Sequence, residues 1–315
     1  MIIKRIVLIL AACFSFLQAA FSEMFVADPS IILDNGSYYL IGTNDFEGDA
    51  NRFRIFRSED LINWSDKLQS GDICYAPDAA KSFAGKRYVA PQIFKYGNFY
   101  YLAYGEFRIA IAKSKSITGP YAQDKIGVIE ADAKQIDPFI FEDDDGKLYI
   151  YFAYAVKDSR IYVAELDKSF ASFKEGSIRE CVKADEPWEN IDKREFPTAE
   201  GPTLIKRNGK YVLFYSANDF RSGDYAVGYA VSDTPIGPWT KAENNPIIRR
   251  DITGHNGSGH GDIFFDRDGN MWYVFHTHNS DDKVSPRRTA IVRLKESFRN
   301  GTPHYEADMK TFRFL

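Results

Sequence analysis

The sequence predicts an all-β fold, a five-bladed β-propeller that forms a single domain. Three observations lead to this prediction: a motif that occurs five times, a turn signal inside the copies, and a third apolar run after each copy. Each copy opens near a Pro or Gly, and these residues follow one another at intervals of 62, 47, 64 and 59: Pro29, Pro91, Pro138, Pro202 and Gly261. A period of this length, with three or four short strands per unit, is typical of propeller blades.

In the clearest copy, Glu200 precedes a Gly-Pro pair, and two strand-like runs follow at 203–207 and 210–216. Asn208-Gly209 joins them and is a strong hairpin signal, because both central residues of a type I′ turn have positive φ. The third apolar runs predict one further strand per blade, at 54–57, 109–112, 160–164, 225–230 and 289–294. Residues 308–315 are predicted to form a terminal strand that completes the fifth blade.

The composition supports a folded domain with a large core, and the charge argues against a nucleic-acid-binding protein. The chain has 315 residues, 44% hydrophobic and 15% aromatic, which is ample for a buried core and also suits a surface that stacks on sugar rings. The net charge is −4 without basic runs, so nucleic acid is not an expected partner.

Residues 1–22 have the layout of a secretory signal peptide. Lys4 and Arg5 precede an apolar run that is too short to span a bilayer comfortably, and Ala20-Phe21-Ser22 offers small residues around a cleavage point. Residues 10–13 also resemble a lipoprotein cleavage box, which would leave Cys13 lipidated. We therefore predict export to the periplasm or the cell exterior, by either route, with residues 23–315 as the propeller domain. Cys74 and Cys181 fall in different predicted blades and are expected to be free thiols.

The candidate functional side chains are predicted to lie at the propeller axis. Innermost strands line the channel of a propeller, so the starts of the five first strands should converge there. Those starts carry acids, an amide and an imidazole: Asp28, Gln92, Asp137, Glu200 and His260. Three carboxyl groups gathered on one axis are costly through repulsion and desolvation, which favours a catalytic role over a structural one.

These acids carry a resemblance to a known family. Ala27-Asp28-Pro29, Ile136-Asp137-Pro138 and Ala199-Glu200-Gly201-Pro202 are similar to the three acidic motifs of glycoside hydrolase family 43, and the similarity covers essentially all of 23–315. Five-bladed sucrose-cleaving hydrolases have a longer Asn-Asp-Pro-Asn-Gly signature and an Arg-Asp-Pro motif. Ala27 and Ile136 occupy the preceding positions here, so family 43 is the better match.

The resemblance implies an inverting glycosidase with one role for each acid. Asp28 would be the general base that activates water, Glu200 the general acid, and Asp137 the residue that orients Glu200 and keeps its pKa high. Inversion needs one ionised and one protonated carboxyl group, roughly 6.5–9.5 Å apart, with room for a water molecule.

Further site residues follow from the same resemblance. His260 matches a histidine that helps to hold calcium in several members, so no cofactor is strictly required but calcium could bind near the axis; a core histidine is the alternative. Arg288 aligns with an arginine that contacts the sugar, although the neighbouring Arg287 leaves that assignment open by one residue. Val89 stands where many members have a Trp, and Phe139, Trp188 and Gln92 are predicted to contact substrate instead.

The predicted activity is hydrolysis of pentose linkages in plant-type oligosaccharides or polysaccharides. A terminal α-L-arabinofuranosyl unit is the leading substrate, and β-1,4-xylosyl linkages follow. The alternative function is a non-catalytic propeller that binds glycans or another protein through the same funnel.

Overall fold

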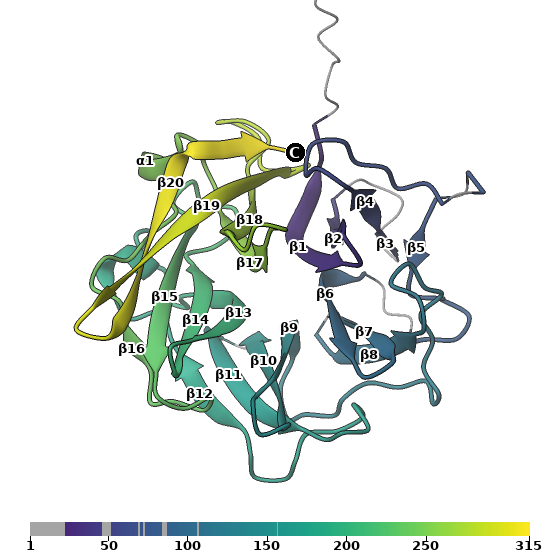
Figure 1. Cartoon of the computed structure of the whole chain (residues 1–315). Helices are drawn as coiled ribbons and strands as arrows, with labels where there is room; N and C mark the ends of the chain where they lie inside the picture. The colour runs from purple at the N-terminus through teal and green to yellow at the C-terminus, as the bar shows by residue number, and fades with distance from the viewer. Residues whose placement is uncertain are drawn as a thin grey trace, which may run out of the picture.

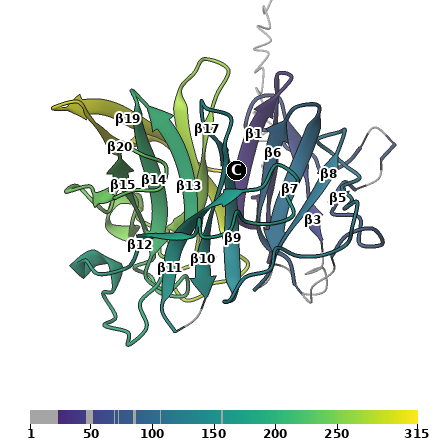
Figure 2. The same cartoon turned by 90° about the horizontal axis from the view of Figure 1, so that it is seen from below.

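The structure is a computed structural model that describes residues 23–45, 52–68, 70–71, 73–83, 87–105, 107–155 and 157–315. Its strands form five antiparallel blades around a central axis, which confirms the predicted propeller (Figure 1). Seen from the edge of the ring, the strands run roughly along that axis (Figure 2). The predicted signal peptide, Cys13 included, lies outside the described residues, so its processing stays a prediction. In the described ranges, no helix has the length and apolar character needed to cross a bilayer.

Blades two to five each form one sheet, in which the first strand along the chain lies nearest the axis. Blade two consists of β6 (Val89–Tyr96), β7 (Phe99–Gly105) and β8 (Ile109–Ser114). Blade three consists of β9 (Gln135–Glu142), β10 (Leu148–Ala155), β11 (Ser159–Leu166) and β12 (Arg179–Val182). Blade four consists of β13 (Ala199–Arg207), β14 (Lys210–Ala217), β15 (Ala226–Ser232) and β16 (Thr240–Lys241). Blade five consists of β17 (Gly259–Phe265), β18 (Met271–Thr277), β19 (Arg288–Arg299) and β20 (Thr302–Phe314).

Blade one is less regular. Its inner strands are β1 (Val26–Asp34) and β2 (Ser37–Asn44). The third strand is interrupted at Ile55, so that β4 (Phe56–Ser58) pairs with β2 while β3 (Phe53–Arg54) pairs with β5 (Tyr75–Ala76). Two short helices lie in connections between blades: η1 (Pro187–Glu189) and α1 (Arg250–Thr253).

The core consists of five apolar clusters, one in each seam between neighbouring blades. Strand β14 shows how the sequence builds them, because successive side chains of a strand point to opposite faces. Tyr211, Leu213 and Tyr215 pack towards blade three, whereas Val212 and Phe214 pack towards blade five. Each sheet is thus buried on both faces, which explains the nearly continuous apolar runs in the sequence.

The two ends of the described chain meet and close the ring. Met24 donates its N–H to the carbonyl of Leu315 (2.6 Å) and accepts from the N–H of Thr289 (2.9 Å). The C-terminus accordingly lies beside the start of β1 in Figure 1. The predicted terminal strand exists and is longer than expected, since β20 begins at Thr302 and pairs along β19.

Candidate active site

All five innermost strands begin with the same backbone irregularity. Each contains a register shift against its neighbour, and one residue at each shift has a positive φ between 43° and 61°: Asp28, Ala90, Asp137, Gly201 and His260. Left-handed backbone is uncommon for residues other than glycine, and bulges of this kind re-aim a side chain. The bulges therefore turn two acids and an imidazole towards the axis. Strained backbone of this kind is often found at functional sites.

This register corrects one detail of the sequence prediction. Glu200 does not occupy the position of Asp28 and Asp137; Gly201 does, and Glu200 stands one residue earlier, opposite Ser216 of β14. Glu200 is partly exposed, whereas the other two acids are buried. The three acids still interact with one another, since the charge of Asp28 acts on both of the others.

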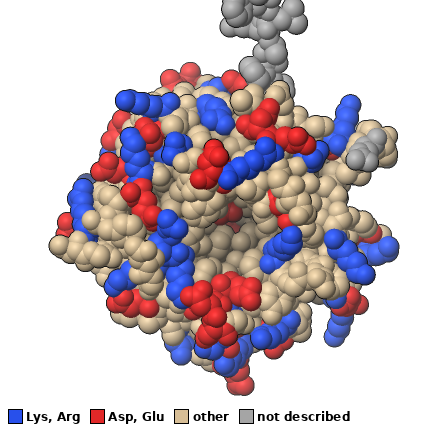
Figure 3. Space-filling model, in the orientation of Figure 1, with Lys and Arg blue, Asp and Glu red and all other residues tan. Residues whose placement is uncertain are grey.

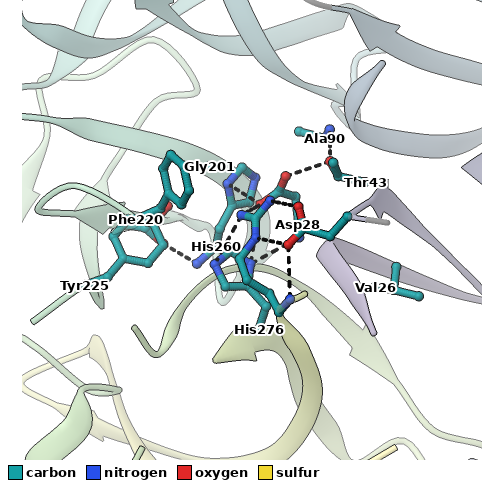
Figure 4. Close-up of polar contacts among 12 residues, drawn as sticks. Val26, Asp28, Thr43, Ala90, Gly201, Phe220, Tyr225, His260 and His276 are labelled. Atoms are coloured by element: carbon teal, nitrogen blue, oxygen red, sulfur yellow. Dashed lines mark hydrogen bonds and ion pairs between the residues drawn. The ribbon is translucent and has the colours of Figure 1, made fainter. Parts of the chain in front are cut away.

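Asp28 is held in place from several sides (Figure 4). Its carboxylate accepts hydrogen bonds from Thr43 Oγ1 (2.6 Å) and from a guanidinium nitrogen of Arg287 (2.9 Å). The Nδ1 atoms of His260 and His276 each lie 3.4 Å from the same carboxylate oxygen. The backbone N–H of Asp28 donates to His276 Nδ1 (3.1 Å), which requires that nitrogen to be unprotonated.

These contacts keep Asp28 ionised. Burial alone would raise its pKa, but the Arg287 charge, the imidazoles of His260 and His276 and the hydrogen bond from Thr43 together outweigh burial and hold the pKa far below its usual value. Burial lowers the pKa of both His260 and His276, so these imidazoles are neutral near pH 7. Arg287 is therefore the cation that fixes the charge of Asp28.

Arg287, not Arg288, lies at the acids. Its side chain is 5% exposed, and its guanidinium also donates to Asp45 (2.9 Å) and lies under the ring of Phe220. Arg288 instead pairs with Glu23 and stacks on Phe314, away from the acids. The reason is strand alternation: Thr289 faces β1 through its hydrogen bonds to Val26, so residue 287 shares that side and residue 288 does not.

The surroundings of Glu200 and Asp137 raise the pKa values of these two acids, whereas those of Asp28 lower its pKa. Burial and the charge of Asp28 raise the pKa of Glu200 to about 7, although Tyr225, which donates its hydroxyl to Glu200 (2.8 Å), lowers it. Burial and the charge of Glu200 raise the pKa of Asp137 well above its usual value. The pair therefore holds a proton near neutral pH, while Asp28 does not. The backbone N–H of Gly201 donates to Asp137 (3.0 Å) and links the two acids structurally.

His260 stands at the axis as predicted, but its surroundings do not form a direct calcium site. Calcium prefers six to eight oxygen ligands, whereas the oxygens of Asp28 already bind Thr43 and the cationic Arg287. Among the described residues, no group of three or more His, Cys, Asp or Glu side chains is arranged to hold a metal. A calcium ion held through water beside His260 stays a prediction.

The other predicted substrate contacts have structural roles. Gln92 uses both ends of its amide on the backbone of Ile140, at 2.6 and 3.2 Å, and so ties blade two to blade three. Trp188 is a core residue rather than a sugar platform, because it packs on Tyr215 and against Gly228 between blades three and four. Phe139 is partly buried against the same cluster, although it also lines a small axial cavity.

That axial cavity reveals an acid that the sequence prediction missed. The cavity has a volume of about 30 Å³ and lies beneath the bulges, and Asp262 lines it. Asp262 is buried and bridges two blades by accepting hydrogen bonds from Ser30 Oγ and Thr203 Oγ1, both at 2.6 Å. The available signal was its repeat position, because Asp262 directly follows Gly261 as Gln92 directly follows Pro91. Asp45 and Tyr225 gave no comparable signal.

The arrangement suits acid–base chemistry at the base of an open funnel. The space-filling view shows a hollow at the centre of the ring with acidic side chains inside it (Figure 3). A larger cavity of about 670 Å³ lies near Met24, Trp64 and Leu315 and includes none of the three acids. Cys74 and Cys181 are free thiols, as predicted, and contribute nothing to the site.

Comparison with known proteins agrees with this geometry. Residues 18–303 match the model of glycosyl hydrolases family 43. The chain is 26% identical to a beta-xylosidase from Xylanibacter ruminicola, over 87% of this chain and 95% of that protein, and 26% identical to the beta-D-galactofuranosidase xynD of Aspergillus niger, over 84% and 78%.

Among solved structures, an endo-1,4-beta-xylanase from Bacteroides thetaiotaomicron superposes with a TM-score of 0.79 at 36% identity, covering 90% of this chain and 95% of that one. The family match spans nearly the whole chain, and curated relatives are glycosidases. The chain therefore belongs to glycosyl hydrolase family 43 and is a glycosidase that hydrolyses glycosidic bonds.

Proposed function

We propose that this glycosidase is exported and cleaves pentose linkages of plant-type polysaccharides with inversion at the anomeric carbon. The observation that supports the mechanism is that the surroundings of two carboxyl groups push their pKa values apart. Arg287 keeps Asp28 ionised, whereas burial and negative charge keep Glu200 protonated up to about pH 7. A pair of carboxyl groups with pKa values pushed apart supplies one base and one acid.

In the proposed reaction, Asp28 accepts a proton from a water molecule as that water attacks the anomeric carbon. The bond from that carbon to the leaving oxygen breaks, and Glu200 donates its proton to the leaving oxygen. Asp137 interacts with this acid, because the charge of an ionised Glu200 raises the pKa of Asp137 and so keeps Asp137 neutral. Water thus enters from the side opposite the leaving group, and the products are a sugar of inverted configuration and a free hydroxyl group.

The substrate class rests on the named activities of the relatives. They act on xylosyl, arabinosyl or galactofuranosyl linkages, and four of them are named for xylose and arabinose together. We propose α-L-arabinofuranosyl and β-1,4-xylosyl linkages as the substrates. Incubation with arabinan, arabinoxylan, xylo-oligosaccharides and an aryl galactofuranoside, with chromatography of the products, tests this choice. Release of neither pentose would contradict it.

The roles of the acids are tested by Asp28→Asn and Glu200→Gln. Each should lower turnover by roughly 10²–10⁴-fold, because each removes one proton transfer. Glu200→Gln should retain far more activity on aryl glycosides with a good leaving group, which need little protonation, whereas Asp28→Asn should not. Asp144→Asn, an exposed carboxyl in the β9–β10 turn, is the matched control and should behave like the parent. Proton NMR of the first-formed anomer reports inversion.

The alternative, a non-catalytic glycan-binding propeller, predicts another outcome. The parent protein would then bind polysaccharide without hydrolysing any member of the panel. Normal turnover by Asp28→Asn or Glu200→Gln would also remove the proposed roles, even if the parent were active.

A further inference from the structure

One buried carboxylate joins three of the five inner strands. Asp262 of β17 accepts hydrogen bonds from Ser30 Oγ of β1 and from Thr203 Oγ1 of β13, both at 2.6 Å. This distance is in the range for a hydroxyl that donates to an ionised carboxylate. The N–H of Ile263 also donates to Asp262 (2.7 Å), so both carboxylate oxygens are occupied. Asp262 lies beneath the catalytic bulges, but the proposed reaction gives it no role.

The three joined residues occupy equivalent places in their strands. Each stands two positions after the residue that has a positive φ at the bulge, which is Asp28 in β1, Gly201 in β13 and His260 in β17. Two residues of a strand span roughly 7 Å. The hydrogen bonds of Asp262 therefore hold the inner strands directly beside the bulges that carry the acids.

This position matters because the proposed base and the proposed acid belong to strands that are not neighbours. Strand β17 lies between β1 and β13 around the axis (Figure 1). The three strands belong to separate sheets, so no backbone ladder fixes the spacing between them. Side chains must set that spacing, and Asp262 is a single group that contacts the strand on either side of its own.

We propose that Asp262 is a positioning residue that sets the separation between the carboxyl groups of Asp28 and Glu200. An inverting glycosidase needs these groups roughly 6.5–9.5 Å apart, and a misplacement of about 1 Å can cost about 10²-fold in rate. Ser30 ties Asp262 to the strand of the base, and Thr203 ties it to the strand of the acid. This inference rests on the proposed function for the roles of the two acids.

Removal of one tie at a time tests the proposal. Ser30→Ala loosens the strand of the base, so kcat should fall about tenfold on a pentose oligosaccharide and on an activated aryl pentoside alike. Thr203→Val loosens the strand of the acid, so kcat should fall about tenfold on the oligosaccharide but stay within about twofold of the parent on the aryl pentoside, which needs little protonation. KM should change less than about twofold in both variants, because both side chains are buried.

Two substitutions of Asp262 itself separate its hydrogen bonds from its charge. Asp262→Asn keeps an oxygen that accepts from Thr203 and from the N–H of Ile263, and its amide can donate to Ser30 Oγ. This variant should therefore keep kcat on the oligosaccharide within about threefold of the parent, whereas Asp262→Ala should lower it about 10²-fold. Equal losses in the two variants would contradict a role that depends on the ties.

Asp34→Ala is the control for the loss of a buried carboxylate between blades. Asp34 ends β1 on the side away from Asp28, and it joins blade one to blade two by accepting from the hydroxyl of Tyr100 (2.7 Å). The control should lose stability and keep the kcat of the parent on both substrates. A loss of kcat as large as that of Asp262→Ala would show that general destabilisation, rather than positioning, slows the reaction.

Melting temperatures separate this proposal from the proposed function. Ser30→Ala and Thr203→Val should each lower the Tm of the parent, but neither should lower it further in the Asp262→Ala background, because the shared acceptor is absent. A parent without turnover on any substrate would reject the proposed function, and this non-additive melting would still support the ties. Additive melting, or an active parent in which Thr203→Val slows both substrates equally or slows neither, would overturn the role of Asp262 alone.

Discussion

At the scale of single residues, two neighbouring arginines have separate roles. Arg287 is buried between Asp28 and Asp45, while Arg288 lies at the surface against Glu23 and Phe314. Asp45 accepts from the backbone N–H of Arg287 as well as from its side chain, so it fixes the guanidinium over Asp28. The positive charge, rather than exposure to solvent, keeps the proposed base ionised.

Replacing this arginine should shift the acid side of the pH profile. Asp28 must be deprotonated to act, so activity falls as the pH drops through its pKa, which Arg287 holds low. Arg287→Gln should raise that pKa, and kcat/KM should begin to fall at a higher pH than in the parent. The variant also leaves the buried Asp28 carboxylate without its cationic partner, at a cost of about 3–5 kcal/mol of folding free energy. Arg288→Gln is the control, and identical acid limbs in the two variants would refute the assignment.

The alkaline side of the profile should depend on Tyr225. Glu200 must be protonated to act, so activity falls as the pH rises through its pKa of about 7. Tyr225 lowers that pKa by donating a hydrogen bond. Tyr225→Phe should therefore move the alkaline limb to higher pH and leave the acid limb in place. A pH–rate profile of kcat/KM measures both limbs, and a downward movement of the alkaline limb would contradict the assignment of Glu200 as the acid.

At the scale of secondary-structure elements, the bulge at the start of each inner strand builds the site. Gly201 occupies the bulge position in blade four, and a Cβ atom there would come within 2.9 Å of the His260 ring. The absence of a side chain at this point lets the imidazole of blade five pack against blade four. The same bulge places Glu200 beside Tyr225.

Gly201→Ala tests this packing against a matched glycine. Gly209, in the β13–β14 turn, also has a positive φ but has nothing near its missing Cβ. Both alanine variants meet the left-handed penalty of about 1–2 kcal/mol. Gly201→Ala should lose more stability than Gly209→Ala in chemical denaturation, and it alone should lose turnover, because the displaced His260 lies against Asp28. Equal stability and activity in the two variants would count against this role of the bulge.

The elements were largely predictable from the sequence, and the bulge register was not. Asn208-Gly209 and the apolar runs predict the hairpins, because turn chemistry and burial on both faces are local properties. The acids Asp28 and Asp137 were found through their repeat positions. The one-residue offset of Glu200 was missed although the motif contains it, since Glu200 stands two residues before Pro202 while Asp28 and Asp137 directly precede Pro29 and Pro138; what the motif does not show is the bulge that gives Gly201 the positive φ.

The remaining errors arise from contacts across blades. Trp188 was expected at the substrate, but Gly228 of β15 leaves room for its ring in the core. Gln92 was expected to bind sugar, but its amide is matched by the backbone of Ile140 in the next blade. Such partners lie 40 or more residues away along the chain, and a single sequence gives no sign of which distant segment will meet them.

At the scale of the whole molecule, the site depends on closure of the ring. Asp28 belongs to blade one, whereas its cation Arg287 and the imidazoles of His260 and His276 belong to blade five or the loop before β19. The seam between these blades is held by an apolar cluster and by hydrogen bonds of Met24 and Val26 to Thr289. Any loosening of this seam separates the proposed base from the residues that keep it ionised.

Thr289→Val tests the coupling between closure and catalysis. The Thr289 hydroxyl accepts from the N–H of Val26 and donates to its carbonyl, both at 2.9 Å, and the side chain is fully buried. Valine keeps the shape but leaves both backbone groups unpaired, so we expect a loss of about 2–4 kcal/mol. For a domain of this size the melting temperature should fall by roughly 4–8 °C.

Thr311→Val is the matched control, because its hydroxyl also accepts from one backbone N–H, that of Arg293, and donates to one carbonyl, that of Asp308. These partners lie within blade five and are partly exposed, so water can replace the lost bonds and the melting temperature should change less. Thr289→Val alone should also lower kcat/KM well below the melting transition, because Thr289, unlike Thr311, joins blade five to the strand that carries Asp28. Equal losses of stability and activity in the two variants would show that the seam contributes no more to the site than any other pair of strands.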